Sequence, residues 1–295
     1  MLGILRRYGT LIGIACVFVY FWIELPHTFL TSRNLLNITQ QMSMLAVVAF
    51  TMTVAMAMGD FDLRVGAMAS LAEGFVGGAI NGILVSYVGI LPFIATLGAM
   101  TALSGLAFRV SGGKTNFGSA IPPTFSNFAR GGTAIWPTSL TSPNLTWVAL
   151  GGLGLIYALL EHTVHGRRLY AIGGGAEAAR LAGVRIGPLR KAAFALSELG
   201  AAVAGLMYAS RVASANPTQG AGLMLDAIAA IFLGMTISDG GQPRVLFTRA
   251  GVLILDVLGN GFTPLNVDSY VREMITGAIV IAAVAASSVG RSRQA

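Results

Sequence analysis

Charged side chains are scarce in this sequence: Asp, Glu, Lys and Arg make up 11% of its 295 residues, whereas an ordinary soluble domain carries about 25%. Hydrophobic residues make up 55%, and the mean hydropathy is +0.73. This composition excludes a water-soluble globular protein. Apolar runs long enough to cross ~30 Å of hydrocarbon recur with short polar links between them, which predicts an all-α, polytopic membrane protein.

Cysteine and histidine are almost absent. The single cysteine, Cys16, lies inside the first apolar run, which excludes a disulfide framework and a thiol-based metal site. His162 and His165 have the spacing of two ligands on one helix, but the sequence places no third ligand near them. We therefore interpret them as solvated histidines at the membrane interface and predict no metal site.

Acidic residues are fewer than basic residues, 12 against 19, so the net charge is +7. In a soluble domain this balance would suggest a nucleic acid partner. Here the cations lie mostly beside the ends of apolar runs, which is typical of cytoplasmic loops in membrane proteins. The sequence therefore predicts contact with a lipid bilayer and no nucleic acid.

Nine apolar segments are candidate membrane spans. The cations near both ends of the sequence and in a basic loop over residues 166–191 all favour the cytoplasm. Four candidates follow this loop but five precede it, and an odd number of crossings cannot join two cytoplasmic points. Either a helix is missing or one early segment turns back, and we favour the segment over 65–88. The nine candidates are 9–25, 41–58, 65–88, 91–110, 145–161, 192–212, 222–237, 245–262 and 271–289.

Two polar loops interrupt the apolar pattern. Residues 111–144 contain four prolines and many Ser, Thr and Gly, and we expect them to form a periplasmic loop. Residues 166–191 carry six of the nineteen Lys and Arg. Within this basic loop Gly175 is positioned to cap a short helix over 176–182, and Gly183 to end it. Such a helix could insert its apolar face into a partner protein or lie on anionic lipid, and composition alone does not separate the two.

Two stretches imitate nucleotide-binding motifs. Residues 112–115 (GGKT) resemble the end of a phosphate-binding loop, but Phe108 stands where that motif needs a glycine. Residues 168–178 could form a strand followed by a dinucleotide fingerprint, with Glu198 twenty residues beyond. The second strand of that unit is replaced by an apolar span, which would place Glu198 inside the membrane. We reject both interpretations.

Four stretches, in order, resemble the permease subunits of bacterial ABC-type monosaccharide importers, the ribose, xylose and arabinose permease group. They are residues 59–66 (GDFDLRVG), 93–97 (FIATL), 169–184 (LYAIGGGAEAARLAGV) and 225–230 (LDAIAA). Each stretch alone is weakly specific, but the ordered set covers most of the chain. The resemblance implies a single transmembrane domain over 1–295, in the bacterial inner membrane, that translocates a sugar by alternating access and is not an enzyme.

The resemblance also implies partners. In that family a separate ATPase binds ATP and docks on a cytoplasmic coupling helix, a periplasmic sugar-binding protein delivers the substrate, and two permease copies form the channel. No cofactor is therefore expected in this chain. The residues that the resemblance assigns to ATPase coupling are Gly173, Gly175, Glu177, Ala178, Arg180, Leu181 and Gly183.

The sequence departs from the family pattern of about ten helices in three places, one of which is residues 240–249 (GGQPRVLFTR), where the family is usually richer in glycine. After Ala72 roughly one helix, ~20 residues by the spanning rule, is missing. Arg64 stands where the family usually has Ser, and a charge at that depth requires a partner, for which Asp60 and Asp62 are the nearest candidates. The missing helix would fuse two crossings into one and would account for the odd number of early segments.

Polar residues inside the spans are candidates for a sugar pathway, because sugar hydroxyls require hydrogen-bonding partners. Two alternatives remain open. An ion-coupled secondary transporter could use Glu198, Asp226 or Asp256, and a non-functional permease remnant could result from the internal deletion. The pathway candidates that we select are Asp62, Asn81, Asp226 and Asn260.

Overall fold

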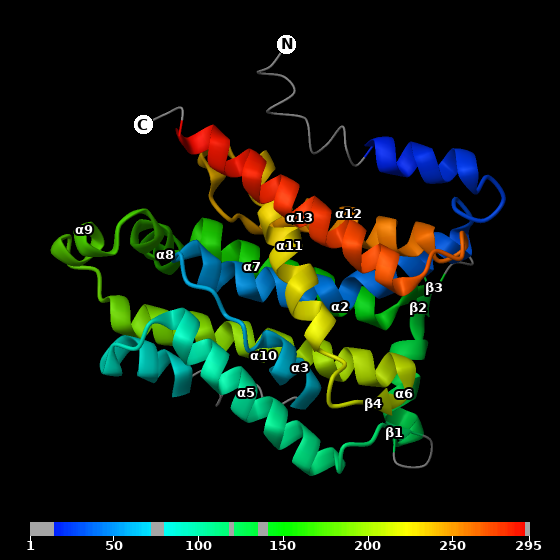
Figure 1. Ribbon diagram of the computed structural model, residues 1–295, viewed down its shortest axis with the longest axis horizontal. Coiled ribbons are helices and arrows are strands. Elements are labelled where there is room, and N and C mark those ends of the chain that lie inside the picture. Colours follow the sequence, from blue (N-terminus) through cyan, green and yellow to red (C-terminus); the bar gives the residue numbers. More distant parts are fainter. Residues whose placement is uncertain (1–14, 72–79, 118–120, 135–140, 293–295) are drawn as a thin grey trace.

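The computed structural model describes residues 15–71, 80–117, 121–134 and 141–292. Helices dominate these ranges, and most of the long ones run along the longest dimension of the molecule (Figure 1). The strands form two short antiparallel ribbons of two strands each. The prediction of an all-α polytopic membrane protein is therefore confirmed.

Helices coincide with eight of the nine predicted apolar segments, and five of them are long and apolar enough to cross a membrane. The largest difference lies at the second segment, which begins at Ser32 rather than near residue 41. The reason is a helix cap: the Thr31 side chain accepts a hydrogen bond from the backbone N–H of Asn34. The eight helices are Ala15–Glu24, α2 (Ser32–Ala57), α5 (Pro92–Ser111), α7 (Asn144–His162), α10 (Ile186–Val212), α11 (Ala221–Ile237), α12 (Val245–Phe262) and α13 (Ser269–Ser292).

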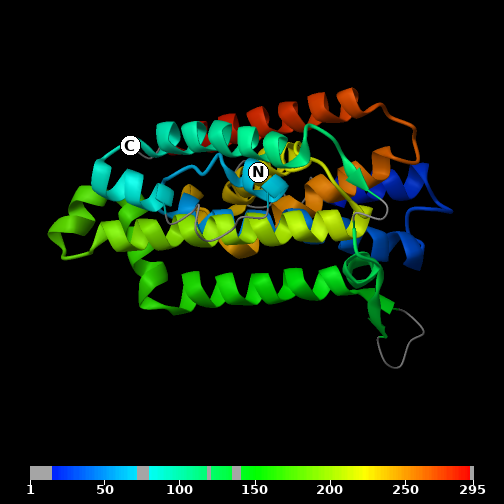
Figure 2. The ribbon, with the colours of Figure 1, turned by 90° about the horizontal axis from the view of Figure 1, so that it is seen from below.

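The two ends of the molecule differ. At one end lie helices α8 (Val164–Gly174) and α9 (Ala176–Leu181), which belong to the predicted basic loop; we call it the basic end (Figures 1 and 2). At the other end, the ribbon end, lie most of residues 111–144 (Figure 1). This predicted loop contains a helix that we did not predict, α6 (Pro123–Arg130), which begins at a proline because proline already has a helical φ. The ribbons pair β1 (Asn116–Phe117) with β4 (Ser214–Ala215) and β2 (Gly132–Ala134) with β3 (Thr141–Pro143).

Helix α2 forms the centre of the bundle and contacts α7, α10, α11 and α12. Its residues from Ser43 to Ala57 are all buried. The hydroxyls in this stretch are satisfied locally: Thr51 donates to Val47 O at 2.9 Å and Thr53 to Ala49 O at 2.6 Å. A central helix without charged residues in its buried half is expected where lipid and other helices surround it on all sides.

Small residues let the helices approach closely. A Cβ on Gly205 of α10 would collide with the Ala69 carbonyl, and one on Gly251 of α12 with the Ala230 carbonyl of α11. Such contacts substitute for a hydrophobic driving force, which is absent between helices in lipid.

The structure describes two parts of the predicted segment over 65–88, residues 65–71 and 80–88. The segment begins with α3 (Val65–Leu71), which follows α2 after a turn at Gly59, where φ is +82°. Asp60 lies beside Arg190 near the start of α10, and Ala69 lies beside Gly205 near its end. At 1.5 Å per residue these positions on α10 are roughly 20 Å apart, so the chain moves that far from the basic end toward the ribbon end.

The later part of the segment lies near the basic end again. Ser86, in the π-helical turn Leu84–Val88, donates a hydrogen bond to Gly187 O at 3.2 Å, and Gly82 packs directly on Lys191. The later described end of the segment therefore lies beside the first turns of α10, where Asp60, which precedes the segment, also lies. This placement is in keeping with a segment that turns back, and the count of four crossings before the basic loop and four after it stays a prediction. The proposed deletion point after Ala72 lies outside the described residues.

Candidate functional site

The helix that we expected in the basic loop is present as α9, Ala176–Leu181, and Gly175 is its N-cap. Gly183 follows in the left-handed region with φ +83°, as predicted for the residue that ends the helix. We call α8, α9 and the turn to Gly183 the elbow. Residues 168–172, which imitate a strand in the dinucleotide motif, are helical and belong to α8.

The exposed surface of α9 combines one ion pair with one large apolar side chain. Arg180 donates to both Glu177 carboxylate oxygens, at 2.6 and 3.1 Å, and these side chains are 66% and 69% exposed. Leu181 is 78% exposed. Ala179, by contrast, is buried against the bundle, and Ala178 faces outward. The elbow therefore rests on its own bundle through Ala179 and presents Leu181 to the exterior.

The elbow is fixed to the central helix at Gly173. A Cβ at this position would collide with the carbonyl oxygen of Ala57, the last residue of α2. At the adjacent Gly174 a Cβ would meet nothing within 4 Å. Displacement of the elbow would therefore act directly on the end of α2.

Tyr170 of α8 connects the elbow to two other segments. Its hydroxyl lies 3.2 Å from Pro243 O, in the turn between α11 and α12, and 3.4 Å from Glu161 Oε1, near the end of α7. Burial and the Glu161 carboxylate raise the pKa of Tyr170, so the hydroxyl remains a donor. Arg244 Nη1 is 4.0 Å from Glu161 Oε2 and completes the contact.

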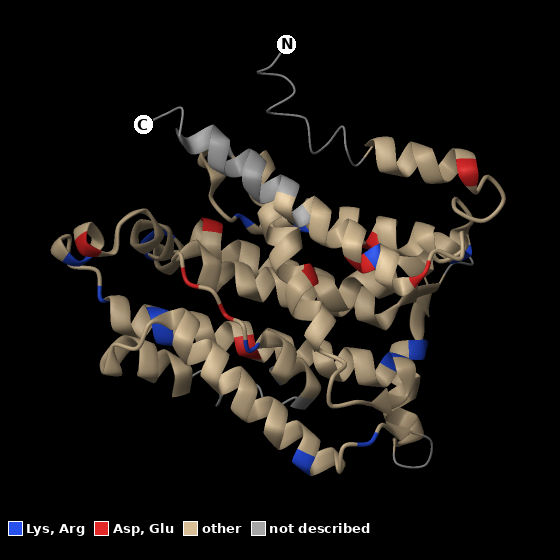
Figure 3. Cartoon of the chain, in the orientation of Figure 1, with Lys and Arg blue, Asp and Glu red and all other residues tan. Residues whose placement is uncertain are grey.

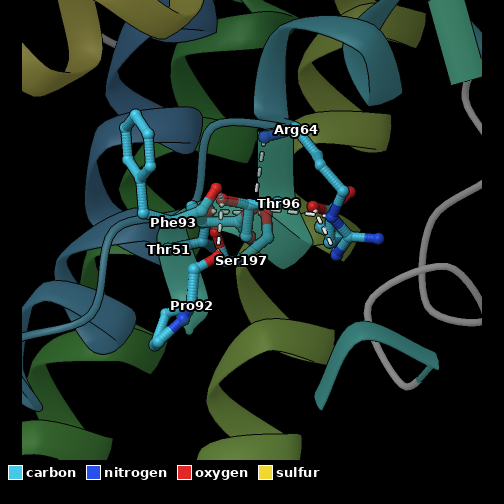
Figure 4. A network of polar contacts seen from close by, with 8 residues as sticks. Thr51, Arg64, Pro92, Phe93, Thr96 and Ser197 are labelled. Carbon is cyan, nitrogen blue, oxygen red and sulfur yellow. Dashed lines mark hydrogen bonds and ion pairs between the residues drawn. The ribbon is translucent and has the colours of Figure 1, made fainter. Parts of the chain in front are cut away.

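A second group of functional candidates lies in the middle of the bundle. Arg64 Nη2 is 2.8 Å from Glu198 Oε1, and Arg64 Nε is 3.7 Å from Asp62 Oδ1. All three side chains are at most 2% exposed. Figure 4 shows the polar contacts around Arg64, in which the Ser197 carbonyl accepts a hydrogen bond from the Thr51 hydroxyl at 3.5 Å. We call Asp62, Arg64 and Glu198 the buried triad.

The predicted partners of Arg64 are half right. Asp62 is a partner of Arg64. Asp60 is paired with Arg190 instead, with Arg190 Nε 2.6 Å from Asp60 Oδ2. Glu198 makes the shortest contact with Arg64, and we did not predict it as a partner of Arg64. The distances along the chain do indicate the pairing of Arg64 with Glu198. Asp60 and Arg64 are four residues apart in a largely non-helical stretch, which spans ~13 Å at most. Arg190 and Glu198 are separated by about two helical turns, ~12 Å, so the two ion pairs form side by side.

The sugar-pathway candidates do not gather at one site. Asp62 belongs to the buried triad, whereas Asn260 lies near the ribbon-end terminus of α12 and accepts a hydrogen bond from Asn34 at 2.9 Å. Asn81 is 1% exposed, and its amide has no hydrogen-bonding partner among the described residues. Asp226 on α11 is electrostatically coupled to Arg272 of α13. Polar residues inside apolar runs of the sequence are indeed polar groups within the bundle, but the sequence did not indicate which of them face each other.

The motifs that imitate nucleotide and metal sites have structural roles. Gly112 and Gly113 end α5 with φ values of +63° and +71°, at the ribbon end. The His162 ring packs edge-on against Tyr157 at 5.0 Å. Within the described ranges no three His, Cys, Asp or Glu side chains are grouped as metal ligands would be.

Comparison with known proteins identifies the family to which this chain is similar. The family model described as "Branched-chain amino acid transport system / permease component" matches residues 9–284. The chain is 32% identical to the ribose import permease protein RbsC of Bacillus subtilis, with 96% of this chain and 92% of that protein covered. It is 33% identical to the L-arabinose transport system permease protein AraH of Escherichia coli, with 94% and 89% covered.

A third relative is the galactose/methyl galactoside import permease protein MglC of Escherichia coli, 33% identical over 88% of this chain and 79% of that protein. The alignment with the Bacillus subtilis protein extends over 305 residues, more than the 295 of this chain, so the relative carries residues that this chain lacks. No solved structure matches. By the extent of these matches, this multi-pass membrane protein belongs to the permease-component family of branched-chain amino acid and related transport systems.

Proposed function

We propose that this chain is the membrane-spanning permease subunit of an ATP-driven importer and that its substrate is a monosaccharide. The observation that carries the proposal is the elbow, a short capped helix that presents an exposed leucine at one end of the bundle. The relatives support the substrate class, because their names specify import or transport of ribose, arabinose and galactosides.

The orientation follows from charge. The blue segments in Figure 3 include several around α8, α9 and the start of α10, which are the cations of the basic loop. Basic loops stay in the cytoplasm, so the basic end faces inward and the ribbon end faces the periplasm. The elbow then faces the compartment that contains ATP. The ribbon end, including residues 111–144, faces the compartment in which a sugar-binding protein would deliver the substrate.

In this proposal a separate ATPase docks on the elbow at Gly173, Gly175, Glu177, Ala178, Arg180, Leu181 and Gly183. ATP-driven closure of the ATPase moves the elbow, and the contact between Gly173 and Ala57 transmits the movement to α2. A second permease copy completes the channel. Asp62, Asn81, Asp226 and Asn260 are the groups that we propose for the sugar pathway.

One observation favours a second candidate, an ion-coupled secondary transporter. Glu198 and Asp62 are buried carboxylates in the middle of the bundle, and such groups form proton and ion pathways in transporters. Arg64 carries one positive charge and balances one of these two carboxylates, so one carboxylate remains that could hold a proton or an ion.

Uptake measurements separate the candidates. The chain would be reconstituted in vesicles with the ATPase that co-purifies with it, and uptake of labelled ribose, arabinose and galactose would be measured. The proposal expects uptake that requires ATP and survives collapse of ion gradients by ionophores. Uptake that follows an ion gradient and ignores ATP would establish the secondary transporter. Absence of uptake by a correctly folded chain under both conditions would identify a permease remnant.

A further inference from the structure

A cavity of 510 Å³ opens between α7 and α10 at the basic end. These helices run alongside each other and are joined at this end through α8 and α9 (Figure 2). Val54 of α2 contributes to the lining, and Leu159 and Leu169 contribute from α7 and α8. The rest of the lining comes from α10, including Leu189, Leu196 and Leu199. We call this cavity the inner groove.

The inner groove is apolar along its length and cationic at one end. Its charged or titratable lining residues are Lys191 and His165, which both lie at the basic end. No acidic side chain of the described chain lies within ion-pair distance of either one. Leu199, at the opposite limit, follows the buried Glu198 and is 42% exposed. The groove therefore runs from a basic rim into the middle of the membrane.

The dimensions of the groove limit what can occupy it. From Leu189 to Leu199 the axis of α10 rises ~15 Å, half of the ~30 Å hydrocarbon core and therefore the depth of one leaflet. Spread over this length, the cavity volume gives a cross-section of roughly 35 Å², which is too narrow for a helix ~10 Å across. An extended hydrocarbon chain fits a space of this shape.

We propose that the inner groove binds an anionic glycerophospholipid of the cytoplasmic leaflet. An acyl chain lies along Leu196 and Leu199, and the headgroup phosphate contacts Lys191 and His165. Charge complementarity supports this occupant, because the Lys191 ammonium lies at the depth of the headgroups and the cytoplasmic leaflet is rich in anionic lipids. The proposal concerns lipid recognition and goes beyond sugar transport, although it shares the orientation of the basic end.

Binding of defined lipids to the purified chain tests the proposal. Delipidated protein would be titrated with short-chain phosphatidylglycerol or phosphatidylcholine, and bound lipid would be counted by native mass spectrometry. Lys191→Gln keeps the stem that packs on Gly82 and removes the charge. We expect it to weaken phosphatidylglycerol binding about fivefold and to leave phosphatidylcholine binding unchanged. The matched control is Lys114→Gln, an exposed lysine at the ribbon end, which should change neither.

A second variant tests the acyl-chain part of the groove. Ala192 lines the groove and is exposed, so Ala192→Phe fills the space without disturbing the core and should abolish binding of both lipids. Ala102→Phe, at an exposed position of α5, is its control. Unchanged lipid binding in Lys191→Gln and Ala192→Phe would overturn the proposal. A change from dimer to monomer in Ala192→Phe without loss of lipid would overturn it too, in favour of a second copy of the chain. The titration uses neither ATPase nor sugar, so its failure would leave the transport proposal intact.

Discussion

Arg64 and Glu198 form an ion pair in the middle of the bundle, with Arg64 Nη2 2.8 Å from Glu198 Oε1 and both side chains at most 2% exposed. The pair joins α10 to the stretch that directly precedes α3. A second pair, Arg190 with Asp60, joins the same two segments closer to the basic end. Two ion pairs thus fix the stretch from Asp60 to Arg64 against α10, just before the segment in which the resemblance to importer permeases indicates a missing helix.

Removal of one partner of this buried pair should destabilise the protein strongly. Arg64→Met leaves the carboxylates of Asp62 and Glu198 without their guanidinium, which costs about 3–5 kcal/mol at buried sites. We expect a large decrease in the thermal unfolding midpoint of the detergent-purified protein, followed by circular dichroism. Arg64→Met combined with Glu198→Leu and Asp62→Asn should recover much of the loss, because the triad then carries no charge and an apolar pair of similar volume is tolerated.

The ion pair on α9 provides the control for this measurement. Arg180 and Glu177 approach to 2.6 Å, but their side chains are 66% and 69% exposed. Exposed pairs contribute about 0–1 kcal/mol. Arg180→Ala should therefore leave the unfolding midpoint nearly unchanged. Equal decreases in Arg64→Met and Arg180→Ala would contradict the assignment of a buried pair.

Adjacent glycines on α8 should respond differently to the same substitution. A Cβ on Gly173 would collide with Ala57 O, whereas one on Gly174 would meet nothing within 4 Å. Gly173→Ala should displace α8 from α2 and destabilise the protein by about 1–3 kcal/mol, as overpacking does. Gly174→Ala should be neutral or slightly stabilising, because Ala favours helix. The unfolding midpoints of the two variants test this difference, and equal values would contradict the close contact with α2.

Leu181 should contribute strongly to the affinity of the proposed ATPase. The side chain is 78% exposed in the isolated chain, and complete burial of a leucine is worth about 1.5–3 kcal/mol, or roughly 10–100-fold in affinity. Leu181→Asp should therefore remove the ATPase in a pull-down and leave the unfolding midpoint unchanged. Val164→Asp, in the first turn of α8 and 48% exposed, is the matched control and should retain the ATPase. Retention by Leu181→Asp would contradict docking on α9.

The sequence predicted the spanning helices and the elbow because their signals are local. Hydropathy marks a crossing, and the pair Gly175 and Gly183 marks both ends of α9. Helix α8 was not predicted, because its glycines and basic residues give it no helical hydrophobic pattern and it packs on α2 through tertiary contacts. The partners of Arg64 could not be assigned from neighbours alone, because Glu198 approaches only when α3 folds back along α10.

Asn260 shows a further limit of sequence reasoning. Its place inside an apolar run made it a pathway candidate, but its side-chain oxygen accepts a hydrogen bond from Asn34, which ties α12 to α2. A sequence records that a residue is polar and buried but not which residue it faces. The positions of the basic residues were more informative than the polar residues inside the spans. Two cytoplasmic segments must be joined by an even number of membrane crossings, so this count constrains the whole chain. It indicated that one of the five early segments does not cross, and the gap in the resemblance after Ala72 then pointed to the segment over 65–88.

The even number of crossings leads to a prediction about sidedness. Tyr87 is 63% exposed near the start of α10, so it should lie on the same side of the membrane as Ala178 of the elbow and opposite Lys114. In a Cys16→Ser background, Lys114→Cys should react with a membrane-impermeant maleimide in intact spheroplasts. Tyr87→Cys and Ala178→Cys should react only after permeabilisation. If residues 65–88 crossed the membrane, Tyr87→Cys would instead react together with Lys114→Cys, and four crossings before the elbow would be wrong. Full reactivity of all three variants after permeabilisation is the control that each site is accessible.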